Sequence, residues 1–366
     1  MQETETTSRG ASETHETSSH ALPFVTIPGH TRASDKALRL SNGSSLIHGS
    51  LLVPPGERNS SSLHTSPERS IVEPESIHPP ETPGELRRFL ESLGRRPTKA
   101  LGQNFLVDRN LARLVAESAE ILSSDRVVEV GSGLGALTRH LIERAGFVRC
   151  VERDRFLLEA CRGLFPPGER LAYWEGDVLA GKRALDPGLV ATLEVDRAAR
   201  PEAPEKWVSN LPYNVAGPLL AILLSTREPL RRITCTIQKE MADRVTARPG
   251  GRDYGPLAIL AGLAGTARVV RVFGPGAFWP PPKVHSAIVD LVVHERRPAG
   301  LAALADWLPA LFGQRRKTLA GALVKSTFPD RTTAEVAERV AGLGIDPRVR
   351  PEDLRPEEFL ELIQLK

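Results

Sequence analysis

A short apolar segment that runs into a glycine-rich turn constrains the fold of this chain most. Arg126-Val-Val-Glu-Val130 has the composition of a buried strand, Gly131-Ser-Gly-Leu-Gly135 follows it directly, and the apolar spacing from Leu137 predicts a helix. Glycines let the backbone turn tightly and let a ligand approach the main chain. Open α/β sheets bind ligands at the carboxyl ends of their strands, so this turn is a candidate binding site.

Strand and helix patterns alternate along the central part of the chain. Further strands are predicted at 148–151, 170–174, 207–209, 233–237, 267–273 and 286–293. Helices are predicted at 154–164, 216–224, 240–247 and 256–263. Parallel neighbours in a sheet need crossover connections, so the alternation predicts an α/β fold with a doubly wound sheet. The last two strands have no helix between them, which predicts that one of them runs antiparallel.

The two ends of the chain differ from this central region. Residues 1–80 carry 6 basic and 9 acidic residues and one aromatic residue, Phe24. Such a segment buries too little apolar surface to offset the ordering of its backbone, and we expect it to be disordered. A lead-in helix is predicted after Gly84, and from residue 298 only helical patterns follow. We therefore expect a tail at 1–80, an α/β domain at 81–297 and a helical domain at 298–366.

The sequence also indicates the cellular location of the protein and whether it binds a membrane or a metal. No apolar run is long enough for a membrane helix, and the amino terminus lacks the features of a targeting segment. The three cysteines form no Cys-x-x-Cys and lie in apolar or helical patterns, so they are expected to be buried free thiols of a reducing compartment. No His/Cys spacing suits a metal. We expect a cytoplasmic monomer without a metal site and without a membrane partner.

An acidic residue, Glu152, ends the strand that follows the glycine turn. A carboxylate at this place can accept both ribose hydroxyls of an adenosine cofactor, which fits S-adenosylmethionine and NAD equally well. The turn has Gly-x-Gly-x-Gly spacing and Ala136, whereas the dinucleotide fingerprint is Gly-x-Gly-x-x-Gly with Ala accepted at its last place in some variants. The turn and the acid by themselves leave both cofactors open.

The segment Asn210-Leu-Pro-Tyr213, directly after an apolar strand, decides between these cofactors. It would present an amide oxygen, backbone carbonyls and an aromatic face to a planar substrate that carries an amino group. The oxygens can accept both hydrogens of a base's exocyclic amine, and the ring can stack on the base. Alone, the segment is explained equally well as a simple turn. After the glycine turn and Glu152, it favours methyl transfer from S-adenosylmethionine to an amino group.

Eight motifs, in order along the chain, give a resemblance to the small-subunit ribosomal RNA adenine dimethyltransferases, the KsgA-type family, over roughly residues 97–366. The motifs are Gly102-Gln-Asn-Phe-Leu106, Gly131 to Gly135, Glu152, Glu175-Gly-Asp177, Asn210-Leu-Pro-Tyr-Asn214, Gln238-Lys-Glu240, Phe278-Trp-Pro-Pro-Pro-Lys-Val284 and Gln314-Arg-Arg-Lys-Thr318. The resemblance implies a Rossmann-like S-adenosylmethionine-dependent methyltransferase sheet with a small helical domain after it.

The resemblance also implies roles for individual residues. The implied cofactor contacts are Gln103, Asn104, Leu106, Gly131, Gly133, Glu152, Asp177, Val178 and Asn210. Among them, Glu152 would hold the ribose and Asp177 the adenine amine. The implied catalytic set is Asn210, Leu211, Pro212, Tyr213 and Phe278, with Phe278 facing Tyr213 across the target base.

The implied substrate is a pair of adjacent adenosines in a loop near the 3′ end of small-subunit (16S-type) rRNA, within a small ribosomal subunit precursor. The residues expected to contact RNA are Lys99, Lys283, Arg315, Arg316 and Lys317. Two alternatives stay open: a large-subunit rRNA adenine methyltransferase, and a non-catalytic nucleic-acid-binding assembly or transcription factor. The chain departs from the family in its tail, at His285, and over 181–205, a long connection that we expect to be a surface insertion.

Overall fold

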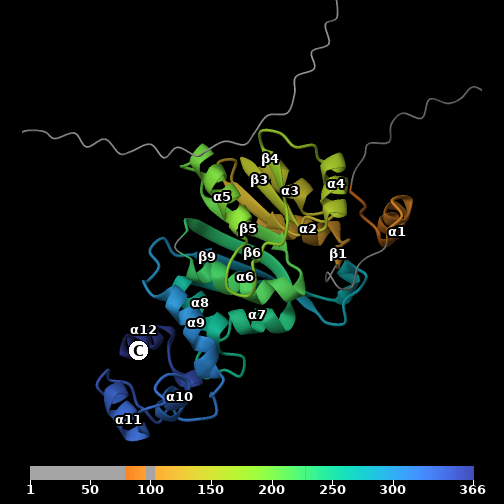
Figure 1. Cartoon of the computed structure of the whole chain (residues 1–366). Helices are drawn as coiled ribbons and strands as arrows, with labels where there is room; N and C mark the ends of the chain where they lie inside the picture. Colours follow the sequence, from red (N-terminus) through yellow and green to blue (C-terminus); the bar gives the residue numbers. More distant parts are fainter. Residues whose placement is uncertain (1–78, 96–103, 227) are drawn as a thin grey trace, which may run out of the picture. The chain divides into compact units, whose positions relative to one another are not determined.

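The computed structural model describes residues 79–95, 104–226 and 228–366, and its central feature is a seven-stranded sheet (Figure 1). The strand order is β4-β3-β2-β5-β6-β9-β7. The strands are β2 (Arg126–Val130), β3 (Phe147–Glu152), β4 (Leu171–Glu175), β5 (Glu205–Asn210), β6 (Leu230–Gln238), β7 (Gly265–Phe273) and β9 (Ser286–Val293). β9 runs antiparallel to both β6 and β7, and the other neighbours are parallel. The predicted α/β sheet with one antiparallel strand among the last two is confirmed.

Helices connect and cover these strands. They are α1 (Pro83–Ser92), α2 (Arg109–Ser118), α3 (Thr138–Arg144), α4 (Arg155–Leu164), α5 (Pro187–Ala199), α6 (Tyr213–Ser225), α7 (Lys239–Val245), α8 (Pro256–Ala264), α9 (Leu301–Phe312), α10 (Leu319–Ser326), α11 (Thr333–Ala341) and α12 (Pro356–Leu362). Short 3₁₀ helices lie at Pro275–Ala277, Pro351–Asp353 and Ile363–Leu365. Local sequence explains several of the starts. Asp108, for example, accepts a hydrogen bond from the Leu111 N–H at 3.1 Å and caps α2.

The sheet has an apolar core on each face, because successive residues of a strand point to opposite sides. Val127 and Val148 pack with α2 and α3 on one face. Val128 and Trp207 pack on the other face with side chains of α5, α6 and α8. This second core continues without a break into α9, α10, α11 and α12.

The C-terminal helices occupy the region where only helical patterns were predicted. α9 lies beside α6 and α8, and α12 also contacts α8 (Figure 1). The expected boundary at residue 298 falls in the loop between β9 and α9. None of the helices in the part of the chain that the structure describes is long and apolar enough to cross a membrane. The expected disorder of the tail concerns residues outside that part, except Pro79 and Pro80, which are buried.

The expectation that 181–205 is a surface insertion is wrong. Pro187–Ala199 within this segment form α5, the helix that connects β4 to β5. Asp186 caps it by accepting from the N–H groups of Gly188 at 2.8 Å and Leu189 at 3.3 Å, and Pro187 suits the first helical turn.

The polar residues of α5 account for the error. Arg149 of β3 donates to the Asp196 carboxylate at 2.8 and 2.6 Å. An aspartate usually indicates solvent exposure, but this pairing lets Asp196 pack against the sheet, where the residue is only 5% exposed. Leu189 and Leu193, 0% and 1% exposed, anchor the same side of the helix.

Replacing the cap of α5 tests its contribution. Asp186→Ala is expected to lower the free energy of unfolding by about 1 kcal/mol, because two N–H groups lose their acceptor. Urea denaturation measures this change. Glu194→Ala on the exposed side of the same helix is the control and should have almost no effect; equal losses in both variants would contradict the capping role.

Candidate active site

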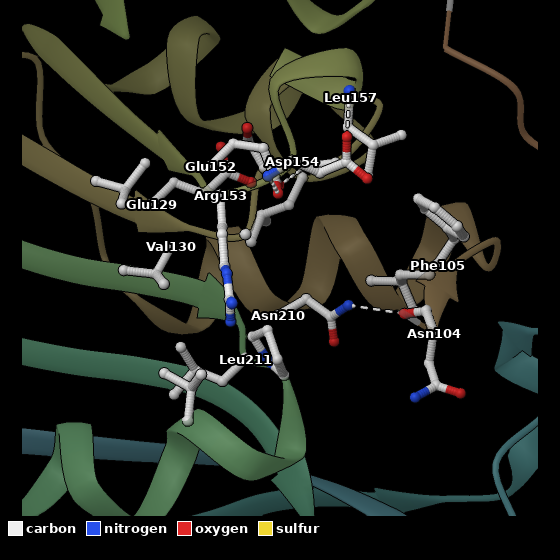
Figure 2. A pocket seen from close by; sticks show the side chains of 18 of the residues that line it. Asn104, Phe105, Glu129, Val130, Glu152, Arg153, Asp154, Leu157, Asn210 and Leu211 are labelled. Atoms are coloured by element: carbon white, nitrogen blue, oxygen red, sulfur yellow. Dashed lines mark hydrogen bonds between the residues drawn. The ribbon is translucent and has the colours of Figure 1, made fainter. Parts of the chain in front are cut away.

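A pocket opens at the carboxyl ends of β2, β3 and β5, where the strand order reverses (Figure 2). It encloses about 1180 Å³ of empty space, part of it open to solvent. The structure brings together in its lining most of the residues implied by the resemblance. These are Asn104, Leu106, Gly131, Gly133, Glu152, Asp177, Val178, Asn210, Leu211, Pro212, Tyr213 and Phe278. Gln103 lies outside the described residues.

The glycine turn after β2 forms the floor of this pocket. Gly131, Gly133 and Gly135 have φ angles of 75°, 55° and 82°, in the left-handed region that favours glycine. A Cβ on Gly135 would lie 2.4 Å from the ring of Phe165. A Cβ on Gly131 would lie 3.5 Å from Pro212, so the turn comes close to the segment after β5. The glycine turn and the segment after β5, some 80 residues apart in the sequence, therefore lie next to each other in the pocket.

Glu152 is held at the end of β3 by backbone donors. Its Oε2 accepts from the Gly133 N–H at 3.0 Å and its Oε1 from the Asp154 N–H at 2.9 Å. Burial raises the pKa of this carboxyl, and the two N–H donors oppose that shift. Each oxygen keeps capacity for a further hydrogen bond, so the carboxylate fits a pair of ribose hydroxyls.

Asp177 follows β4, and Arg153, which the sequence analysis missed, lies beside it. Asp177 Oδ1 accepts from the Leu179 N–H at 3.1 Å, and Arg153 places a guanidinium nitrogen 3.1 Å from Oδ2. Both side chains line the pocket. The position of Arg153 directly after Glu152, at a strand end, was the available signal. An adenine amine bound to Asp177 would share the carboxylate with Arg153.

The segment around Asn104 reaches the pocket through a second, two-stranded sheet. β1 (Phe105–Leu106) pairs with β8 (Phe278–Trp279), with Leu106 opposite Phe278. The pairing places the Asn104 carbonyl where it accepts from Asn210 Nδ2 at 3.3 Å, the dashed line in Figure 2. Phe278 is 3% exposed, and its ring packs against Phe273 at a centroid distance of 5.7 Å.

The segment after β5 is fixed from the neighbouring strands. Thr236 of β6 donates from its hydroxyl to Asn210 Oδ1, and its carbonyl accepts from the Leu211 N–H at 3.2 Å. The Tyr213 hydroxyl lies 2.8 Å from Ser286 Oγ of β9. Burial raises the pKa of the Tyr213 phenol, and the hydrogen bond with Ser286 opposes that shift.

The amino-terminal part of the described chain also contributes to the pocket, which the sequence did not indicate. Pro80 and Leu86 line it. α1 reaches this place because Leu86 packs with Leu134 of the glycine turn and Leu157 of α4. Glu81 pairs with Arg139 of α3 and holds the start of the helix.

Glu129 is a further pocket residue that sequence reasoning missed, although an acid inside the apolar run of β2 was a visible signal. Its side chain is buried and accepts from Thr138 Oγ1 at 2.6 Å and from the Cys150 thiol at 3.5 Å. Burial raises the pKa of Glu129 to about 7. Cys150, Cys161 and Cys235 are buried and free, as predicted.

Of the basic residues expected to contact RNA, the four that the structure describes, Lys283, Arg315, Arg316 and Lys317, do not line the pocket. Lys283, Arg316 and Lys317 are exposed. Arg315 instead donates to the Arg252 carbonyl at 3.2 Å and pairs with Glu352 at 3.4 Å. Lys99 lies outside the described residues. Within 79–95, 104–226 and 228–366, no three His, Cys, Asp or Glu side chains are grouped as metal ligands would be.

The family model described as ribosomal RNA adenine dimethylase matches residues 95–366. The chain belongs to this family. The resemblance noted in the sequence is thereby confirmed, and with it the assignment as an S-adenosylmethionine-dependent methyltransferase. The buried Glu152 carboxylate and the left-handed glycine turn fit that cofactor.

Curated relatives agree with the family over most of their length. "Ribosomal RNA small subunit methyltransferase A" of Moorella thermoacetica is 36% identical over 285 residues, which cover 77% of this chain and 96% of that protein. The protein of the same name from Rubrobacter xylanophilus is 39% identical over 267 residues, 73% of this chain and 94% of the relative.

Solved structures agree in fold. A dimethyladenosine transferase from Plasmodium falciparum matches with a TM-score of 0.55 and 24% identity, over 70% of this chain and 94% of that one. The 23S rRNA methyltransferase ErmE matches with a TM-score of 0.50 and 24% identity, over 71% and 98%. These two likenesses support the Rossmann-like sheet alone.

The raised pKa of Glu129 predicts a pH-dependent effect on stability. The folded-state pKa of about 7 lies above the ordinary value of 4.5, so the protonated form is favoured in the folded protein. The contribution of the protonated Glu129 side chain to the free energy of unfolding is complete below about pH 4.5, and it is lost as the pH rises through about 7. Glu129→Gln stays neutral. When the pH is raised from about 5 to about 8, the free energy of unfolding of the variant should therefore rise relative to that of the wild type by an amount on the order of 3 kcal/mol.

Urea denaturation at both pH values measures this difference. A difference between variant and wild type that stays constant with pH would show that Glu129 does not titrate in this range.

Proposed function

We propose that this protein transfers methyl groups from S-adenosylmethionine to the exocyclic amines of two adjacent adenosines in a loop near the 3′ end of small-subunit rRNA, giving dimethyladenosines during small-subunit biogenesis. The observation that carries the proposal is the meeting, in one pocket, of Asn210-Leu-Pro-Tyr213 with the Glu152 carboxylate and the glycine turn. The printed names of the relatives support the choice of RNA.

The cofactor half of the site is formed by β2, β3 and β4. Glu152 would hold the ribose hydroxyls, the main chain at Gly131 and Gly133 would lie against the methionine part, and Asp177 would accept from the adenine amine. Gln103, Asn104, Leu106 and Val178 complete the proposed contacts. When bound, S-adenosylmethionine supplies a methyl group that is already electrophilic, so the protein needs mainly to position the reactants and exclude water.

The acceptor half is formed by the segment after β5. An adenine amine is a weak nucleophile because its lone pair is delocalised into the ring. Hydrogen bonds from the amine to Asn210 Oδ1 and to the Leu211 or Pro212 carbonyl would favour a pyramidal nitrogen and direct its lone pair at the methyl group. The methylated nitrogen loses its proton readily to water, so no strong general base is required.

Aromatic residues would hold the target base outside its helical stack. Tyr213 and Phe278 both line the pocket, and we place the base between them. Enzymes that modify a base must extrude it or take it from an unpaired region, which favours loop adenosines over continuous duplex.

Four basic side chains would contact the phosphates of the RNA backbone: Lys99, Lys283, Arg316 and Lys317. Residues 283–366 contain 13 basic and 12 acidic residues, so placement rather than bulk charge must direct binding. Arg315, whose guanidinium already contacts Arg252 and Glu352, would support the RNA-facing loop instead. We propose a monomer, and the proposed substrate supports a cytoplasmic setting.

The alternatives are less well supported. ErmE, a 23S rRNA enzyme, is similar at only 24% identity and shares the fold. A non-catalytic binding protein would not need Glu152, Asp177, Asn210 and Tyr213 in one pocket, yet all four line it.

Labelled S-adenosylmethionine and isolated ribosomal subunits test the proposal. With small subunits from cells that lack the enzyme, the wild type should label two adjacent adenosines near the rRNA 3′ end. Asn210→Ala should reduce transfer about a hundredfold or more, because the amine loses its acceptor in the transition state. Its melting temperature should stay close to that of the wild type. Large subunits serve as the control substrate. Methyl label in the large subunits and none in the small subunits would contradict the proposal.

The exposed basic pair gives a separate prediction. The double variant Arg316→Ala/Lys317→Ala should raise KM for small subunits several-fold and lower the slope of log affinity against log salt by about 1 to 2, as expected when phosphate contacts are lost. Cofactor affinity should not change. Arg348→Ala, an exposed arginine of the C-terminal region that pairs with Asp346, is the matched control. Equal effects from both variants would point to a general charge effect.

A further inference from the structure

One buried hydroxyl lies directly beside the proposed acceptor site. Thr236 of β6 stands opposite Asn210 of β5 in the strand register and is 1% exposed. Its hydroxyl donates to Asn210 Oδ1, and its carbonyl accepts from the Leu211 N–H at 3.2 Å. Thr236 therefore contacts the side chain of Asn210 and the main chain of the residue after it.

The Asn210 amide has a second fixed partner on its other end. Asn210 Nδ2 donates to the Asn104 carbonyl at 3.3 Å. A carbonyl oxygen only accepts, so a reversed amide would set Oδ1 against the Asn104 oxygen and leave two acceptors facing each other. The Asn104 carbonyl and the Thr236 hydroxyl together favour one orientation, with Oδ1 toward β6.

This orientation matters for the proposed chemistry. An exocyclic amine brings two N–H donors, so it needs acceptors, and Nδ2 in the place of Oδ1 would repel it. Oδ1 has two lone pairs; the Thr236 hydroxyl uses one and leaves one for the amine. The hydrogen bonds at both ends of the amide also limit its rotation about its last torsion.

We propose that Thr236 is a positioning residue for methyl transfer, whose hydroxyl fixes the orientation of the Asn210 amide so that its oxygen, and not its nitrogen, is available to the acceptor amine. The inference rests on the proposed function, since it takes Asn210 as the acceptor of the amine's hydrogen bond. Thr236 itself touches neither reactant and acts through Asn210.

The same strand carries a matched control. Thr234 is also buried, 0% exposed, and points to the same side of β6 because strand side chains alternate. Its hydroxyl donates to Asp290 of β9 at 3.0 Å, within an ion-pair cluster away from the pocket lining. Removal of this hydroxyl should affect stability without affecting the Asn210 amide.

Three variants test the inference on the full chain: Thr236→Val, Thr236→Ser and Thr234→Val. Thr236→Val should lower kcat on small subunits about threefold to tenfold, the effect of losing one neutral hydrogen bond. Thr236→Ser keeps the hydroxyl and should restore kcat. Thr234→Val should lower the melting temperature and leave kcat at the wild-type value. An unchanged kcat in Thr236→Val, or an equal loss in Thr234→Val, would overturn the inference.

The side-chain amide signal of Asn210 in an NMR spectrum gives a readout that does not depend on activity. Thr236→Val should shift and broaden this signal, and Thr234→Val should not. If the wild type fails to methylate small subunits, the proposed function is wrong. If the wild type is active and the Asn210 signal and kcat are the same in Thr236→Val, only the inference about Thr236 is wrong.

Discussion

The pair of backbone hydrogen bonds to the Glu152 carboxylate is the interaction on which the rest of the site depends. The Gly133 N–H ties the turn after β2 to the end of β3, and the Asp154 N–H turns the chain into α4. A buried carboxylate without such donors would be costly, and with them it becomes a fixed acceptor. The left-handed glycines are required because only they let the turn pass so close to its neighbours.

The two halves of the pocket use different parts of the sheet. β2, β3 and β4 end in backbone turns and carboxylates that suit an adenosine cofactor. The antiparallel β9 and its neighbour β6 instead supply hydroxyls, Ser286 and Thr236, that hold the polar ends of Tyr213 and Asn210. In the acceptor half, the groups that orient Asn210 and Tyr213 therefore come from strands of the sheet.

Local pattern explains which elements were predictable. The strand at 126–130 and the glycine turn depend on neighbours in the sequence, and the structure confirms both predictions. α5 is not evident from the sequence because charged residues suggest a solvent-exposed segment, whereas Asp196 is buried through its pairing with Arg149. Arg153 and Glu129 each carried a local signal, but their partners, Asp177 for Arg153 and Thr138 and Cys150 for Glu129, are set by the packing of neighbouring elements.

The alternating strands and helices, the glycine turn and the chemical character of the segment after β5 are evident from the sequence, because they follow from periodicity and residue type. Which distant residues meet is a property of the folded chain: Asn104 and Thr236 contact opposite ends of the Asn210 amide, and Pro80 and Leu86 line the pocket. Strand register and helix packing are long-range properties. A shift of one residue in the pairing of β5 with β6 would turn Thr236 to the other face, and no local pattern records that choice.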